Sequence, residues 1–499
     1  MQPSVIGGRS VSIGAGGGLN LVGSAIFSDG AVGLHADGDL KLLSTAESDL
    51  SYSSSSVSKS GIFGNGGLSI TIGSKSSSSV TSSASRVQHG SSVASLAGDI
   101  AATAGGQYLQ ISSDLTAPQG DINIVAASVA IKNDSDTTSV LNLIRQRQSG
   151  LTLSASHPLI EVAQTVDQMS KLARRTDNAR YQALGLLTAG LTVYNNFKAF
   201  DADKLQAAAD PLSGSGWGGW SVNASLGSSS YSFDSLTKTS TPVSSTMDAG
   251  RHLTITATGN GAAGGSDSGD ITLIAAKLSA GNDLRLSAAR DITLAAAIGS
   301  SSETRQTRSS SGAIGLGYSS AGGASFSLAA SRSSGYSNGW GTTYWQSQLA
   351  AGETLALTSG RNTALNGAKA SGKRVVGRVG SSGAGDLAIT SPQDEDHYIA
   401  REQSYGLNIS VPVPGTGGIA PPSLGLSRGQ LALMAEYEAV RQQSAINAGS
   451  GGFDISVNGH THLRGGVIST EGAASASRLL TQTLSHESLQ NKDVVQGSS

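Results

Sequence analysis

A short unit that recurs three times within Ser268–Ala297 constrains the fold more than any other feature of the chain. It reads Asp270-Ile-Thr-Leu, then Asp283-Leu-Arg-Leu, then Asp291-Ile-Thr-Leu, and 21 residues separate Asp270 from Asp291. Related units stand at residues 38–45, 98–113, 120–131, 250–258, 352–360 and 385–391. Self-similarity with a period of this length is typical of solenoids, whose size is not fixed by the usual limits on a domain.

Each unit combines a Gly-Asp or Asn-Asp corner with four or five residues that alternate between apolar and polar. Alternation with a period of two predicts a strand that buries one face. Because so short a strand must pair with equivalent strands one coil above and below, the period predicts a right-handed parallel β-helix. The side chains expected to point inward are Ile271, Leu273, Leu284, Leu286, Ile292 and Leu294, and those expected to point outward are Thr272, Arg285 and Thr293.

The acidic residues of the repeat are interpreted as turn formers. Aspartate and asparagine side chains bond to nearby backbone in turns, and a glycine at the corner permits a positive φ. Catalytic carboxylates are the alternative, but regular recurrence along the chain favours the turn. The repeat therefore specifies a coil and not a reaction.

Serine-rich segments interrupt the repeat. Ser51–Val87 and Glu303–Leu349 each have two serine-rich arms around a glycine-rich tip, and Trp220–Val243 is a shorter version. Apolar residues alternate near the tips, as at Ile314 and Leu316, and predict β-hairpins that project from or extend the rod. Disorder is the alternative that the serine content suggests.

The segment 145–212 differs in kind, because its apolar residues recur three or four positions apart. Pro158 suits a first helical turn and Asp177 can cap a second helix, which predicts an inserted antiparallel helical hairpin. The chain then divides into 1–144, with the first hairpin, the insert 145–212, and 213–499. The apolar stripe would pack on itself or on the rod, and membrane activity is the less favoured alternative. Its members are Leu159, Val162, Val166, Met169 and Leu172, then Tyr181, Leu184, Leu187, Leu191 and Tyr194.

Composition excludes several classes of protein. The net charge is -2 without a basic stripe, which argues against nucleic acid as a partner. There is no cysteine, so disulfide scaffolds and thiolate metal sites are excluded. No apolar run is long enough to span a membrane as a helix, and the start of the chain does not resemble a signal peptide. We expect the chain to be a piece of a longer polypeptide.

Few residues are candidates for chemistry. His460 and His462 would share one face of a strand and could approach a zinc ion, but an outward polar ladder is the favoured interpretation. Asp394, Glu395 and Asp396 are interpreted as a solvated turn, and Ser427–Gln443 fits either a helix or a strand. We expect no catalytic residue, no cofactor and no metal.

The order of three features resembles the haemagglutinin-repeat region of filamentous haemagglutinin-like exoproteins, including contact-dependent growth inhibition proteins. These features are the serine-rich and glycine-rich units beside the repeat of Ser268–Ala297, the segment from Ser149 to Phe197, and the stretch Gln443–Thr470. The resemblance implies two-partner secretion through an outer-membrane transporter, exposure at the bacterial surface and binding to a receptor or glycan on target cells. The secretion domain and the toxin domain of that family are missing from this sequence, so the chain alone should be neither secreted nor toxic.

The leading hypothesis is a structural and binding segment of an adhesin or toxin-delivery exoprotein. A β-helix carbohydrate-active enzyme and a gene fragment without an independent role are the alternatives. Aromatic side chains gather in one serine-rich segment, and exposed tyrosine and tryptophan are common binding anchors. The predicted partner-binding residues are Tyr318, Tyr336, Trp340, Tyr344 and Trp345, and packing of these rings against the rod is the competing interpretation.

Overall fold

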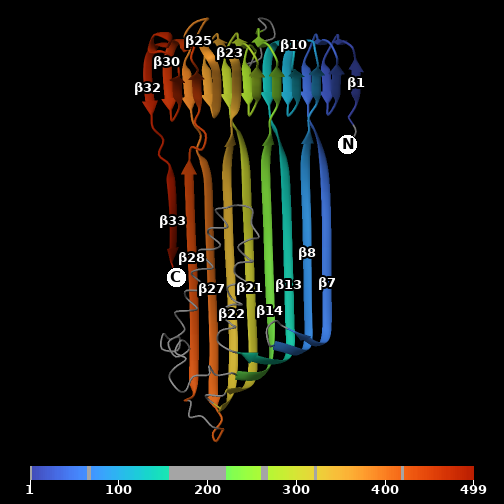
Figure 1. Cartoon of the computed structure of the whole chain (residues 1–499), viewed down its shortest axis with the longest axis vertical. Coiled ribbons are helices and arrows are strands. Elements are labelled where there is room, and N and C mark those ends of the chain that lie inside the picture. The colour runs from blue at the N-terminus through green and yellow to red at the C-terminus, as the bar shows by residue number, and fades with distance from the viewer. Residues whose placement is uncertain are drawn as a thin grey trace.

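Two β-sheets make up the described part of the chain. The computed structural model describes residues 3–64, 69–156, 221–259, 268–319, 323–416 and 421–498. Within these ranges, a parallel sheet of 24 strands forms a stack of coils, and an antiparallel sheet of nine strands extends from it (Figure 1). The described residues contain no α-helix, and their one helical turn is the 3-10 segment Ala474–Ala476.

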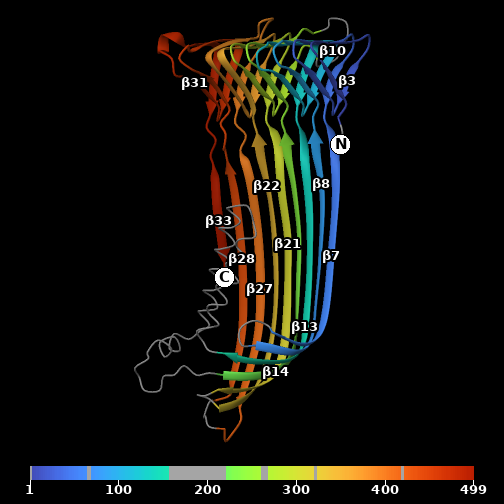
Figure 2. The same ribbon diagram turned by 45° about the vertical axis from the view of Figure 1, so that its right-hand side comes forward.

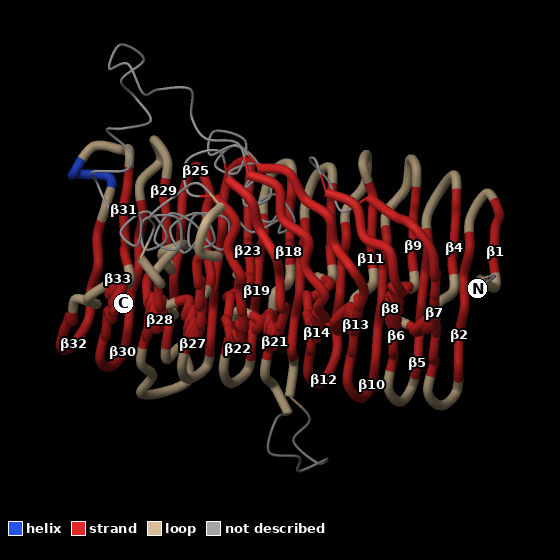
Figure 3. Tube along the Cα trace, turned by 90° about the horizontal axis from the view of Figure 1, so that it is seen from below, coloured by secondary structure: helices blue, strands red, loops and turns tan. Residues whose placement is uncertain are grey.

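The coil stack is built from short strands that pair in parallel with their counterparts in the next coil (Figure 3). Ile100 pairs with Ile122, and Ile271 pairs with Ile292. The strands are β1 Val5–Gly8, β2 Val11–Ala15, β3 Leu19–Val22, β4 Ala25–Ser28, β5 Val32–Ala36, β6 Leu40–Leu43, β9 Ser92–Ser95, β10 Ile100–Ile111, β11 Asp114–Ala117, β12 Ile122–Lys132, β15 Thr246–Ala249, β16 Leu253–Ala257, β17 Ile271–Ile274, β18 Lys277–Ala280, β19 Leu284–Ala288, β20 Ile292–Ala295, β23 Ser347–Ser359, β24 Thr363–Asn366, β25 Ala368–Val379, β26 Leu387–Thr390, β29 Ala445–Ala448, β30 Phe453–Arg464, β31 Val467–Thr470 and β32 Arg478–Glu487.

The core of the stack is a thin aliphatic column, as the alternation predicts. All six side chains predicted to point inward are buried, and Leu286 is 1% exposed. Arg285 is exposed on the outer surface, and Thr272 and Thr293 are partly exposed. The inward and outward assignment from the sequence is therefore confirmed for these coils.

The corner aspartates join one coil to the next. The backbone N–H of Asp291 donates to Oδ1 of Asp270 at 3.1 Å, and that of Asn362 donates to Oδ1 of Asp291 at 2.8 Å. The series continues through Asp386, whose N–H donates to Asn362, and His460, whose N–H donates to Asp386. Each acidic side chain thus satisfies a turn donor of the neighbouring coil, which explains its recurrence without any catalytic role.

Several corner glycines are needed for close stacking, and not for the positive φ that the sequence suggested. A Cβ atom on Gly281 would lie 2.1 Å from the carbonyl oxygen of Gly250, and one on Gly352 would lie 2.0 Å from that of Gly281. Neither Gly250, Gly281 nor Gly352 has a positive φ. Gly269, the corner glycine before Asp270, does have a positive φ of 92°. Positive φ therefore applies at that corner, and close stacking applies at the three others.

The antiparallel sheet is continuous across all the projecting hairpins. Its order is β33-β28-β27-β22-β21-β14-β13-β8-β7, and most of its strands are 17 to 23 residues long. A hairpin leaves the stack after β6, β12, β20 and β26, which end every second coil. Neighbouring strands and neighbouring coils both lie about 4.8 Å apart, so one two-stranded hairpin for every two coils keeps the sheet in step with the stack. The strands are β7 Thr45–Gly64, β8 Ser69–His89, β13 Asp134–Ser156, β14 Ser221–Val243, β21 Ala297–Ser319, β22 Gly323–Trp345, β27 Asp394–Pro412, β28 Ser423–Ala439 and β33 Lys492–Ser498.

These strands confirm some predictions and correct others. Hairpins at Ser51–Val87 and Glu303–Leu349 are confirmed. The described part of the third segment, Ser221–Val243, is a single strand, β14, paired with β13 along its length. Ser427–Gln443 falls largely in β28, so of the two alternatives, helix and strand, the strand is correct. The solvated turn predicted at Asp394–Asp396 is wrong, because these residues begin β27.

The inserted helical hairpin is not supported. Its expected start, Arg145, lies in the middle of β13, where it pairs with Ser232 of β14. The remaining residues of the predicted helices, from 157 onward, lie outside the described residues. Sequence reasoning placed the boundary too early because Arg145–Ser156 is polar enough to obscure the alternation of its leucines.

Candidate interaction surfaces

The antiparallel sheet has two chemically different faces. Alternate residues of a strand point to opposite faces, and paired residues of neighbouring strands share a face. We call the face that carries Trp340, Leu151 and Arg147 the apolar face, and the face that carries Gln148 and Ser311 the hydroxyl face. Of the exposed large hydrophobic residues in this sheet, nearly all lie on the apolar face. A sheet with one apolar side normally buries it against another layer.

One row of aliphatic residues crosses eight strands near the far end of the apolar face. Its residues are aligned by the strand register, and Ile62 is 72% exposed and Leu226 64% exposed. The adjoining row continues the apolar surface with Ile70, Leu153, Leu316, Phe326 and Val411. We call these two rows together the distal zone. The row that crosses all eight strands consists of Ile62, Ile72, Leu151, Leu226, Ile314, Leu328, Ile409 and Leu424.

A row of glycines bends the sheet beside the distal zone. Gly61, Gly73, Gly150 and Gly227 are aligned across β7, β8, β13 and β14. The φ angles of Gly61 and Gly150 are 136° and 152°, and a Cβ atom on Gly73 would lie 2.0 Å from the carbonyl oxygen of Ser149. Figure 2 shows the lower ends of these strands turning away from the rest of the sheet. The absence of side chains at this row is what permits the bend.

A belt of arginines crosses the apolar face between the distal zone and the coil stack. Arg147, Arg332, Tyr405 and Arg428 are aligned by register, and the next row contributes Arg145 and Arg308. Arg145 forms an ion pair with Asp234, which raises the pKa of its guanidinium. Arg428 lies 5.9 Å from the ring centre of Tyr405. We call Arg145, Arg147, Arg308, Arg332 and Arg428 the arginine belt.

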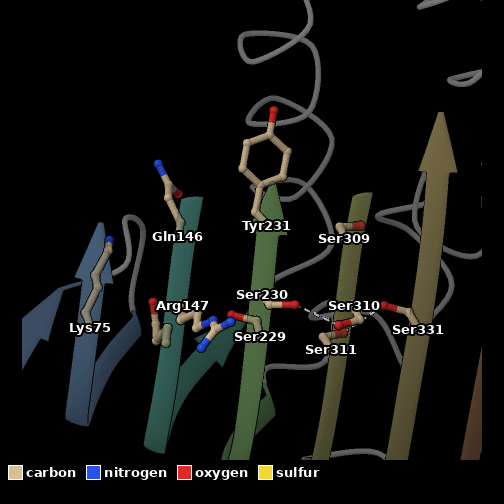
Figure 4. A pocket seen from close by; sticks show the side chains of 11 residues that line it. Lys75, Gln146, Arg147, Ser229, Ser230, Tyr231, Ser309, Ser310, Ser311 and Ser331 are labelled. Atoms are coloured by element: carbon tan, nitrogen blue, oxygen red, sulfur yellow. Dashed lines mark hydrogen bonds between the residues drawn. The ribbon is translucent and has the colours of Figure 1, made fainter. Parts of the chain in front are cut away.

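The hydroxyl face carries a shallow hollow of about 230 Å³ near the bend (Figure 4). Serines of three neighbouring strands line it together with Lys75, Gln146 and Tyr231. The hydroxyls bond to one another across the strands, as in the 2.7 Å contact between Ser311 and Ser331. The residues that line the hollow supply many neutral donors and acceptors and two cations, Lys75 and Arg147, and they include no histidine or carboxylate that could act as a base.

The five predicted aromatic anchors do not form one cluster. Tyr336, Trp340 and Tyr344 share the apolar face of β22 near the coil stack, but Trp345 lies on the opposite face. Tyr318 pairs with Ala324, twelve residues from Tyr336, which places it roughly 40 Å away along the strand. Trp340 is 42% exposed and stacks on His397, with 4.1 Å between ring centres. Tyr336, Trp340 and Tyr344 therefore remain the candidate anchor, and the sequence grouped five residues because it could not show the length of the hairpin.

The histidine pair forms the outward polar ladder. The rings of His460 and His462 are 6.2 Å apart, and both nitrogens of His460 contact hydroxyls, those of Thr483 at 2.6 Å and Ser485 at 2.7 Å. Asp454 is held by Arg378 and Arg478, and the hydrogen bond from Arg378 is the main cause of its lowered pKa. Across the described ranges, no group of three or more His, Asp or Glu side chains is placed to hold a metal ion.

Replacing both histidines with alanine is expected to leave the chain folded and to change the melting temperature by only a degree or two. Both rings are on the surface, where lost hydrogen bonds are largely replaced by water. Zinc chloride is expected to have no effect on the melting temperature of either protein. Zinc-dependent stabilisation of the natural chain, absent from the double variant, would show that the pair binds metal.

Sequence reasoning missed a column of buried serines at the corner where the hairpins leave the stack. Ser91, Ser113, Ser245, Ser347 and Ser444 are all buried there. The hydroxyl of Ser347 donates to the carbonyl oxygen of Ala295 at 2.7 Å and accepts from the N–H of Ala276 at 3.2 Å. A recurring pattern could have revealed this column: the serine is followed two residues later by an apolar residue and four residues later by a small one.

The comparisons with known proteins concern almost the whole chain. The hemagglutinin repeat family matches residues 224–407. The chain is 32% identical to a tRNA nuclease CdiA of Yersinia mollaretii, over 98% of this chain and 16% of that protein. It is 34% identical to a deoxyribonuclease CdiA of Yersinia pseudotuberculosis, over 95% and 42%, and 31% identical to a toxin CdiA of Escherichia coli, over 98% and 15%.

The chain thus spans between 15% and 42% of the length of these three relatives. The part matched by the family is the repeat, and the nuclease activity in the relatives' names lies outside the aligned part. No solved structure matches the chain. No helix in the described ranges is long and apolar enough to cross a membrane.

Proposed function

Because the chain is a hemagglutinin-repeat region that matches CdiA toxins at about 32% identity over nearly its whole length, we propose that it is a non-enzymatic structural and binding segment of a secreted surface filament. In this role it holds the filament rigid, contacts target cells and takes part in delivering a toxin during contact-dependent growth inhibition. The stacked coils form a right-handed parallel β-helix. A partner transporter in the outer membrane secretes the longer exoprotein to which the segment belongs.

The observation that carries this proposal is the antiparallel sheet. Many of its large apolar side chains lie in solvent, including Leu50 at 74% and Tyr52 at 67%. Exposed apolar patches of this extent on a soluble protein usually mark interaction sites. The coil stack supports the function in a second way, because it presents the long strands side by side on a rigid base.

The test is binding of the purified chain to target bacteria. Deletion of the whole segment Glu303–Leu349 would remove β21 and β22 from the centre of the sheet, so point substitutions are needed. Tyr336→Ser combined with Trp340→Ser is expected to reduce cell binding about tenfold, because exposed aromatic anchors supply much of the energy of an interface. The control is His460→Ala combined with His462→Ala, which should bind as the natural chain does. Unchanged binding by the aromatic variant would overturn this assignment.

A further inference from the structure

We propose that the apolar face binds a second protein whose surface carries a row of carboxylates with apolar side chains on both sides. The arginine belt would meet the carboxylates, and the apolar residues on either side of the belt would meet the flanking apolar groups. This inference goes beyond the proposed function, since it names the chemistry of a partner and needs no target cell.

Unpaired charge in the belt is the first argument. Arg147, Arg308 and Arg332 are exposed, and within the described residues no hydrogen bond or ion pair engages their guanidinium groups. Arg332 and Arg428 flank Tyr405 in one row, above an aliphatic row of Ala330, Leu407 and Leu426. These residues line a groove of about 490 Å³. Guanidinium groups at the head of an apolar groove complement an anionic group attached to an apolar surface.

The order of zones along the strands selects a protein as the occupant. On the side of the belt nearer the coil stack, Tyr336, Trp340, Ile399 and Met434 are 40–42% exposed, and on the other side lies the distal zone. A lipid layer offers charge at one border of its apolar region, whereas this face places charge between two apolar regions. A protein surface can carry that pattern, because side chains on a strand repeat every two residues, about 6.7 Å apart, as the rows do here.

The size of the surface fits the same partner. Eight strands about 4.8 Å apart and several rows about 6.7 Å apart give the belt and the distal zone together on the order of 1,000 Å². A stable protein interface buries roughly 800 Å² on each partner. A second copy of this chain, related by a two-fold axis through the belt, would place arginines against arginines, and such like-charge contacts are unfavourable.

The experiment measures binding of a fluorescent synthetic peptide to the full chain by anisotropy. In this peptide every second residue is threonine. The residues between the threonines are aliphatic in the first part of the peptide, acidic in the middle and aliphatic in the last part. A matched peptide has lysine in place of the acidic residues. We expect the acidic peptide to bind at least about tenfold more tightly, and we expect this binding to weaken as salt rises. The triple variant Arg147→Gln/Arg332→Gln/Arg428→Gln should lose the preference and keep its melting temperature.

Two controls separate the outcomes. Lys59→Gln combined with Lys75→Gln removes charge from the opposite face of the same sheet and should leave binding of the acidic peptide unchanged. Equal binding of the acidic and the lysine peptide would overturn the proposal. So would an equal loss of acidic-peptide binding in the arginine triple variant and the lysine double variant. Co-sedimentation with anionic phospholipid vesicles that the triple variant abolishes, without binding of the acidic peptide, would also overturn it and assign the face to lipid. These outcomes are independent of cell binding by the aromatic variant.

Discussion

Replacing Leu286 with aspartate is expected to lower the free energy of unfolding by about 3–5 kcal/mol. Leu286 is 1% exposed in the aliphatic column and pairs with Ile255 in the coil before it and Leu357 in the coil after it. A carboxylate there has no cation within the column to pair with, and water cannot reach it. Denaturant-induced unfolding, followed by circular dichroism, measures the change.

The matched control is the neighbouring residue. Arg285→Asp alters an exposed side chain, and its ion pair with Asp283 lies at the surface. It should change the unfolding free energy by no more than about 0.5 kcal/mol. Equal destabilisation by the two substitutions would contradict the assignment of inward and outward positions.

The second large effect is expected from one methyl group at a coil corner. Gly281→Ala would place its Cβ atom 2.1 Å from the carbonyl oxygen of Gly250. That backbone cannot move away, because Gly281 and Asn282 donate hydrogen bonds of 2.9 and 2.8 Å to the same neighbouring coil. Separating the coils locally is expected to cost about 3 kcal/mol and to lower the melting temperature by several degrees.

Gly17→Ala is the control for this substitution, because no atom lies within 4 Å of the position its Cβ would occupy. Its melting temperature should stay within a degree or two of that of the natural chain. If Gly281→Ala is equally neutral, close stacking of the coils does not depend on the absence of a side chain at this corner.

The sequence by itself determined the coil stack. A period of two places Leu284 and Leu286 on one side of a strand, and a period near 21 returns Ile292 to the position of Ile271. These are local and repeated signals, and each copy reinforces the others. The hairpins at Ser51–Val87 and Glu303–Leu349 could be predicted for the same reason, since their tips alternate.

The tertiary structure alone decided how the hairpins combine. Whether Leu151 lies beside Leu226 depends on the register between β13 and β14, which the coils fix by holding the two ends of each hairpin at one corner. The arginine belt arises in the same way, because Arg147, Arg332 and Arg428 are far apart in the sequence and meet only through pairing across several strands. The sequence of a single strand shows which of its residues share a face. Those faces align into one surface only because the spacing of the coils matches the spacing of the strands.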